Sequence, residues 1–123
     1  LHELKTGELF SLSCELGTLT ATGLRPDFLQ IAHEWGKLFG FLFQILDDLL
    51  DRSATRAELG KTPGKDQRLN RKTIFDFTTE KEIRTLCEKH FEEMRVLSKK
   101  LPAPEALEPG ISKLKKNIKL ALP

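Results

Sequence analysis

Three aspartates lie within an otherwise apolar segment of the chain, FQILDDLLD at 43–51. At 3.6 residues per turn, one narrow helical stripe holds Gln44, Asp47, Asp48 and Asp51. Apolar residues occupy the rest of this helix, so we expect the carboxylates to face an internal cavity. Carboxylates crowded in a poorly solvated place repel one another and protonate unless a cation joins them. The stripe therefore predicts a Mg²⁺ site, since Mg²⁺ combines one or two carboxylates with substrate phosphate oxygens.

A second group of residues that suits phosphate chemistry follows the aspartates. The segment 53–73 carries glycines and a proline among many charges, so we expect a loop of about twenty residues there. Cations in such a loop can screen a transferring or departing diphosphate. Those of this loop are Lys61, Lys65, Arg71 and Lys72. Near the start of the chain, Lys5 and Thr6 form another polar interruption, in an apolar helical segment.

The elements that must position these residues are all helical, and no strand pattern occurs. Leucines at helical spacing predict a first helix from Leu1 to about Ala21, which a glycine and a proline then stop. Asp27 is the expected N-cap of a second helix that runs to roughly Arg52 and is apolar on most sides. The sequence thus predicts an all-α fold with this second helix at its centre.

Two further helices are expected after the loop. Thr79 followed by Glu82 is a capping-box pattern, and it predicts the start of a helix that ends near Leu101. Prolines break the chain there, and apolar residues at helical spacing predict a final amphipathic helix over 111–121. We therefore expect four to five helices.

Length and composition restrict the class of protein. The 123 residues suffice for one domain, and a net charge of +2 with mixed signs gives no support for nucleic-acid binding. Cys14 and Cys87 form no metal-binding or disulfide pattern, which favours a reducing compartment such as the cytoplasm. The apolar run at 38–50 is too short and too charged to cross a membrane.

The chain is expected to be a fragment of a longer protein. It opens at Leu1, without Met, in a pattern that reads as a helix already under way. A missing N-terminus would hide any organelle-targeting sequence, so localisation beyond the cytoplasm stays open. The helix at 28–52 carries more apolar surface than three partner helices can cover, and we expect a homodimer or higher oligomer.

Four motifs in order give the chain a family resemblance. They are KTGELF at 5–10, FQILDDLLD at 43–51, LGKTPGKDQ at 59–67, and Thr73 at the end of the loop. A DDxxD pattern alone is weak, because it can arise on any acidic helix, whereas four elements at fitting separations are a specific signal. In this pattern the chain resembles the C-terminal part of a trans-isoprenyl diphosphate synthase, of farnesyl or geranylgeranyl diphosphate synthase type.

The resemblance implies a fold, a reaction and a set of site residues. The fold is the isoprenoid-synthase helical bundle, in which two aspartate-rich motifs hold about three Mg²⁺ ions against an allylic diphosphate. The reaction adds isopentenyl diphosphate head to tail to that allylic diphosphate, giving a farnesyl- or geranylgeranyl-length product. Asp47, Asp48 and Asp51 would bind Mg²⁺ directly or through water. The residues expected to contact the diphosphate or the reacting allyl group are Lys5, Thr6, Gln44, Lys61, Lys65 and Arg71.

The chain also departs from the family pattern. An arginine, Arg71, stands where the family commonly has the lysine of GKxT, and the glycine before it is lost. The first aspartate-rich motif and the arginines that bind isopentenyl diphosphate have no counterpart in the 123 residues. We therefore expect residues 1–123 to be the C-terminal portion of one synthase domain and to be inactive alone.

Other interpretations remain open. The chain could be a non-catalytic helical partner subunit of an active synthase, since catalytic elements are missing. A terpene cyclase would share the bundle, although the KTG and GKTPGKD elements argue against it. In the simplest interpretation, the aspartates lie on a solvated helix face and the lysines of the predicted loop are solvated surface residues, so that neither group binds a ligand. We expect His33 and His90 to be surface or packing residues, because Mg²⁺ prefers oxygen ligands.

Overall fold

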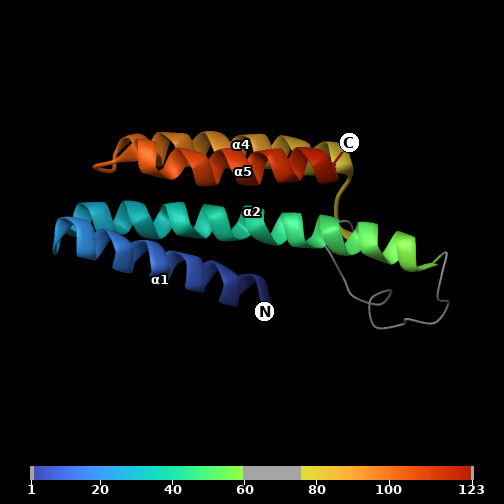
Figure 1. The fold of residues 1–123 in the computed structure, drawn as a ribbon, viewed down its shortest axis with the longest axis horizontal. Helices are drawn as coiled ribbons and strands as arrows, with labels where there is room; N and C mark the ends of the chain where they lie inside the picture. Colours follow the sequence, from blue (N-terminus) through green and yellow to red (C-terminus); the bar gives the residue numbers. More distant parts are fainter. Residues whose placement is uncertain (1, 60–75, 123) are drawn as a thin grey trace.

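A computed structural model describes the backbone of residues 2–59 and 76–122, and the side chains of residues 6–52 and 76–122. This part of the chain forms four helices: α1 (His2–Thr22), α2 (Pro26–Leu59), α4 (Glu80–Lys99) and α5 (Pro104–Ala121). Figure 1 shows α2 in the middle, with α1 along one side and the pair α4 and α5 along the other. The prediction of an all-α fold with a central second helix is confirmed.

Helices α1 and α2 pack through main-chain contact. A Cβ atom added to Gly36 would lie 2.7 Å from Ser11 Cα, and one added to Gly40 would lie 3.0 Å from Gly7 Cα. Ser11 is buried and its hydroxyl donates to the carbonyl oxygen of His33 at 3.1 Å, so a polar bond accompanies the close approach. The two glycines therefore let the antiparallel helices approach more closely than side chains would allow.

The hydrophobic core lies on the opposite side of α2, between that helix and α4 and α5. It is built from large aliphatic and aromatic side chains, whose burial drives the packing. The buried members from the three helices are Leu42, Ile45, Leu46, Leu49, Ile83, Phe91, Met94, Ile111, Leu114 and Ile118. At one end, the indole Nε1 of Trp35 donates to Ser98 Oγ at 2.9 Å, which gives the buried tryptophan its hydrogen bond.

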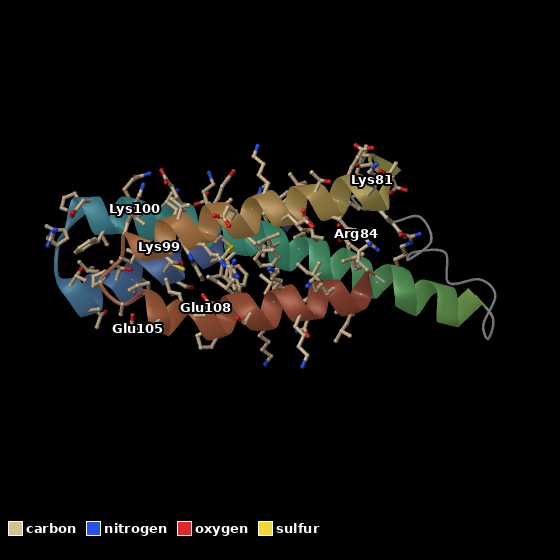
Figure 2. The ribbon with its side chains drawn as sticks, turned by 90° about the horizontal axis from the view of Figure 1, so that it is seen from above. Lys81, Arg84, Lys99, Lys100, Glu105 and Glu108 are labelled. Carbon is tan, nitrogen blue, oxygen red and sulfur yellow. The ribbon has the colours of Figure 1, made fainter. Side chains whose placement is uncertain are left out.

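Thr79 is the N-cap of α4, at the position that the capping-box pattern of the sequence predicts. Thr79 Oγ1 accepts a hydrogen bond from the backbone N–H of Glu82 at 3.2 Å, and it lies 3.1 Å from Glu82 Oε1. Figure 2 shows Lys81 and Arg84 near this end of α4, and Lys99 and Lys100 at the other end, beside the turn into α5. Pro104 occupies the first turn of α5, where its missing N–H costs nothing.

Two predictions about α2 are wrong. Asp27 is not an N-cap, because the helix starts at Pro26 and Asp27 lies in the first turn, paired with Arg25 at 2.9 Å. The helix also continues to Leu59, so residues 53–59 of the predicted loop are helical. Those residues, SATRAEL, contain mainly good helix formers and no glycine or proline. The remainder of the predicted loop up to residue 75 lies outside the described part of the chain.

The exposed apolar surface lies mostly on α1 rather than on α2. The expectation from the sequence placed it on the helix at 28–52, where Phe43 and Leu50 are indeed 43% and 54% exposed. A longer row on α1 has exposed fractions between 40% and 64%: Leu9, Leu12, Leu16 and Leu19. Within the described residues, no helix is long and apolar enough to cross a membrane.

Candidate functional site

The four polar residues of the predicted stripe differ in burial. Gln44 and Asp48 are buried, with 9% and 3% of their surface exposed, and Gln44 Nε2 donates to Asp48 Oδ1 at 3.1 Å. Asp47 and Asp51 are half-buried on the more accessible edge of the same helix face. The stripe thus has an inner, hydrogen-bonded edge and an outer edge on which a cation can approach two carboxylates one turn apart.

The start of α4, to which the segment after α2 returns, lies beside the end of the stripe. Arg52, next to Asp51, forms an ion pair with Glu80 at 2.9 Å, and this pair joins α2 to the first turn of α4. The predicted diphosphate-binding cations belong to that segment: Lys61, Lys65 and Arg71. They lie outside the described residues, so their position relative to the aspartates stays a prediction.

Lys5 and Thr6 lie on α1 within about one helical turn of Gln44, the first residue of the stripe. The antiparallel contacts of Ser11 with Gly36 and of Gly7 with Gly40 set the register of α1 against α2. Lys5 and Thr6 precede Gly7 by two residues and one residue, so this register places them beside residues 41–42 of α2, within one turn of Gln44. Thr6 is half-buried, and for Lys5 the structure describes the helical backbone only. The backbone arrangement therefore brings the KT motif and Gln44 to the same region.

An apolar groove of about 780 Å³ lies over the part of α2 that precedes the stripe, and Phe41 is its lining residue nearest to Gln44 in the sequence. It runs between α1 and α4 over the surface of α2, with Leu38, Phe41, Val96 and Leu97 among its lining residues. Phe41 precedes Gln44 by three residues and Asp48 by seven, so all three share one face of α2. The groove and the polar stripe consequently follow one another along the same face of α2.

The contribution of α4 to this groove was not predicted from the sequence. His90 lies on the groove wall and stacks on Phe41, with ring centroids 4.8 Å apart and an angle of 23° between the rings. The prediction that His90 is a surface or packing residue agrees with this position, where the half-buried ring stacks on Phe41 and lines the groove. The available signal was its place at helical spacing from Leu86 and Phe91 on the apolar side of α4.

The described part of the chain offers a partial set of metal ligands and a buried, unreactive thiol. In residues 2–59 and 76–122, no group of three or more histidine, cysteine, aspartate or glutamate side chains is arranged to hold a metal ion. Asp47 and Asp51 fit the role of a partial ligand set, since their half-buried carboxylates offer the oxygen atoms that Mg²⁺ prefers. Burial raises the pKa of Cys87 to about 11, with Glu88 adding to the shift, so this thiol is a poor nucleophile.

The fold and the site together define a class: an all-α bundle whose central helix carries an acidic, partly buried stripe that leads into an apolar groove. Comparison with known families is specific. The family model described as polyprenyl synthetase matches residues 1–101, and the chain belongs to this family. The resemblance identified from the four motifs is thereby confirmed.

Several curated proteins are similar to the chain. A dimethylallyltranstransferase of Fischerella ambigua is 34% identical over 95 residues, which are 77% of this chain and 27% of the relative. A probable farnesyl diphosphate synthase of Bradyrhizobium diazoefficiens is 38% identical over 69 residues, 54% of this chain and 21% of the relative. A chloroplastic protein of Arabidopsis thaliana, named heterodimeric geranylgeranyl pyrophosphate synthase large subunit 1, is 38% identical over 66 residues, 54% of this chain and 18% of the relative. No solved structure gave a significant match.

The chain thus spans about a fifth to a quarter of the length of these relatives. The enzymes to which it is related are transferases that make prenyl diphosphates, as their names state.

Proposed function

We propose that this chain forms one wall of the active site of a Mg²⁺-dependent prenyl diphosphate synthase. The reaction condenses an allylic diphosphate with isopentenyl diphosphate, head to tail, to a farnesyl- or geranylgeranyl-length product. The observation that carries the proposal is the succession, along one face of α2, of an apolar groove that includes Phe41 and the Gln44–Asp48 pair one to two turns further on. Such a succession suits a substrate with a charged head and a long apolar chain.

The aspartates have distinct roles in this proposal. Asp47 and Asp51, on the accessible edge, hold Mg²⁺, and Asp48 acts through its hydrogen bonds or through metal-bound water. When bound, Mg²⁺ neutralises the charge that develops on the departing diphosphate. Gln44 is oriented by its bond to Asp48, which fixes its side-chain amide toward the stripe.

The cations and Thr6 complete the polar part of the site. Lys5 and Thr6 approach the head of the substrate from α1, within one helical turn of the level of Gln44. Lys61, Lys65 and Arg71 contribute positive charge from the segment after α2 and stabilise the diphosphate as it leaves. The released diphosphate accepts the proton lost from the condensed product. The double bond of isopentenyl diphosphate attacks the allylic cation in a space from which the surrounding leucine and phenylalanine side chains exclude water.

The chain by itself is proposed to bind but not to catalyse. It lacks a first aspartate-rich motif and the arginines that would bind isopentenyl diphosphate. The second candidate function, a non-catalytic partner subunit, rests on the absence of those catalytic elements from the 123 residues. A terpene cyclase remains the third and least supported alternative. We place the protein in the cytoplasm, and an organelle remains open.

Self-association is proposed through α1. Leu9, Leu12, Leu16 and Leu19 alternate at spacings of three and four residues, the a and d pattern of a helix that pairs with another helix. The only charged residue between Leu9 and Leu19 is Glu15, which pairs with His33 at 3.0 Å. Because the exposed row has no charge of its own, two copies can meet without like-charge repulsion.

The test measures the affinity of the chain for geranyl diphosphate by calorimetry, in the presence and absence of Mg²⁺. The wild-type chain binds in Mg²⁺ and loses at least about tenfold in affinity when EDTA replaces the metal. Asp47→Asn shows the same loss in Mg²⁺. The matched control is Glu105→Gln, which removes an exposed carboxylate near the turn between α4 and α5 and leaves binding unchanged (Figure 2).

Two outcomes separate the candidates. Binding that is equal in Mg²⁺ and EDTA, or equal for wild type and Asp47→Asn, contradicts the metal-diphosphate site. A change in the turnover of an active prenyl diphosphate synthase when this chain is added supports the partner-subunit function instead.

A further inference from the structure

Arg52 carries a positive charge at the end of the aspartate stripe, and in the structure this charge pairs with α4. Arg52 follows Asp51 directly in the sequence. Its guanidinium Nη1 lies 2.9 Å from Oε1 of Glu80, the first residue of α4. The helix dipole favours a carboxylate in this first turn. The cation at the end of the stripe is therefore held from the neighbouring helix.

A second carboxylate lies within reach of the same guanidinium. Asp48 precedes Arg52 by four residues, and helical residues at this spacing are neighbours on the helix surface. Side chains of an α-helix lean toward its N-terminus, so a released Arg52 side chain would cover the turn that holds Asp48. Arg52 thus has two candidate partners, Asp48 on its own helix and Glu80 on α4, and the structure shows it with Glu80.

The partner that Arg52 takes decides the charge at the stripe. Asp48 is 3% exposed, and Asp47 and Asp51 lie within one turn of it on α2. A guanidinium binds a carboxylate strongly, through two parallel hydrogen bonds. On Asp48 it would hold a positive charge next to the two half-buried aspartates, where salt screens charges poorly. A divalent cation would be repelled from that place.

The ion pair itself contributes little to the stability of the fold. The side chains of Arg52 and Glu80 are 31% and 48% exposed. Ion pairs with this exposure add little to the free energy of unfolding, because water and salt screen them. Replacement of Glu80 is therefore expected to leave the chain folded and to change mainly the position of the Arg52 guanidinium.

We propose that Glu80 is a positioning residue for the metal site, because it holds the guanidinium of Arg52 toward α4 and keeps it off the aspartate stripe. The inference rests on the proposed function, since it takes Asp47 and Asp51 as ligands of the divalent cation. Without the Glu80 carboxylate, Arg52 turns to Asp48 and competes with the cation for the stripe. Glu80 thus acts on metal affinity through Arg52 rather than as a ligand.

A double-mutant cycle of Arg52 and Glu80 tests this coupling. Mn²⁺ serves as the probe, because it shares the preference of Mg²⁺ for carboxylate oxygen, and its binding is measured by the loss of the electron paramagnetic resonance signal of the free ion. Glu80→Gln is expected to weaken Mn²⁺ binding at least about fivefold. In the Arg52→Gln background, the same change alters the affinity less than about twofold, because no guanidinium is left to compete.

Glu82→Gln is the matched control for the cycle. Glu82 belongs to the same first turn of α4, and it bonds Thr78 and Thr79 rather than Arg52. Glutamine keeps an acceptor oxygen for these bonds, so the variant removes one charge and leaves the Arg52–Glu80 pair in place. We expect its Mn²⁺ affinity to stay within about twofold of the wild type. Circular dichroism at the assay temperature shows whether each variant is folded.

The outcomes separate an effect of position from a simple effect of charge. A loss for Glu80→Gln that is equal with and without Arg52, or equal to that of Glu82→Gln, overturns the inference. Equal Mn²⁺ affinities for the wild type and Glu80→Gln overturn it as well. In each case, loss of Mn²⁺ binding in Asp47→Asn leaves the proposed metal site standing. Absence of any metal binding that depends on Asp47 overturns the proposed function, and the inference with it.

Discussion

Gln44 and Asp48 are hydrogen-bonded to each other one helical turn apart, between Nε2 and Oδ1, and both are buried. A carboxylate placed in the interior needs donors, because leaving it without them costs more than the bond itself contributes. This pair explains how an acidic residue is retained on the inner edge of a helix face that also packs an apolar core. It also makes Gln44 a residue with both a structural and a proposed binding role.

Replacement of Gln44 tests that structural role. Gln44→Leu removes one donor to the buried Asp48 carboxylate, and we expect a loss of about 2 kcal/mol in the free energy of unfolding. Urea unfolding followed by circular dichroism measures the loss. Gln30→Leu is the control, because Gln30 is exposed and bonds only Glu34 at the surface. Equal losses in the free energy of unfolding for the two variants would show that the buried hydrogen bond stabilises the fold no more than the surface bond does.

Close contact between α1 and α2 yields a second prediction. Gly36→Ala places a Cβ atom within 3.0 Å of three main-chain atoms of Phe10 and Ser11, and main chain cannot move aside cheaply. We expect a loss of about 1–3 kcal/mol in the free energy of unfolding. Gly110→Ala, where nothing lies within 4 Å, is expected to raise stability by about 0.5–1 kcal/mol. Thermal unfolding of both variants measures these changes in stability. A Gly36→Ala variant that is more stable than the wild type would refute the close contact between α1 and α2.

Cys87 makes stability depend on pH in the alkaline range. Its pKa rises from an ordinary 9.0 to about 11 in the folded protein because burial disfavours the thiolate. Below pH 9 the thiol is protonated in both states, so its contribution is fully present there. Above pH 9 the unfolded chain loses the proton first, and the contribution is lost as pH rises toward 11.

This alkaline loss is checked by urea unfolding of the wild type and Cys87→Ala between pH 8 and pH 11, since the titration of the lysines is common to both. Cys87→Ala removes the thiol and should flatten the pH dependence relative to the wild type. A thiol reagent gives a second measure: at pH 8 it labels Cys87 at roughly a hundredth of the rate seen for the same thiol in urea. Equal labelling rates in the folded and unfolded chain would contradict the burial.

The leucine row on α1 predicts the oligomeric state. Light scattering at micromolar concentration should give a dimer for the wild type, and Leu12→Glu and Leu16→Glu should raise the dissociation constant at least about tenfold. The control is Leu120→Glu, because Leu120 is 72% exposed on α5, away from the row. A wild-type monomer, or a dimer that only Leu120→Glu disrupts, would place the interface elsewhere.

Local sequence signals predicted the fold better than they predicted the site. The capping box of Thr79 and Glu82 was predictable because both partners lie within four residues of each other. The end of α2 was placed too early, since charged residues at 53–59 suggested a loop although their helix propensities are good.

Burial within the stripe depends on packing between distant segments. A helical wheel puts Asp47, Asp48 and Asp51 on one face, but only the packing of neighbouring helices makes Asp48 buried and the other two half-buried. The groove is built from three helices, and His90 reaches it from α4, 49 residues after Phe41. Periodicity within one segment cannot place residues that meet only through the tertiary fold.

The contact between Gly7 and Gly40 has a consequence for how the site can adapt. Main chain meets main chain there, so no change of rotamer can widen or slide the junction. The distance between the backbone at Lys5 and Thr6 and the backbone at Gln44 is consequently set by the packing of two rigid helices rather than by flexible side chains. Adjustment to a substrate of different size must come from elsewhere in the bundle, or from α1 and α2 moving together as one body.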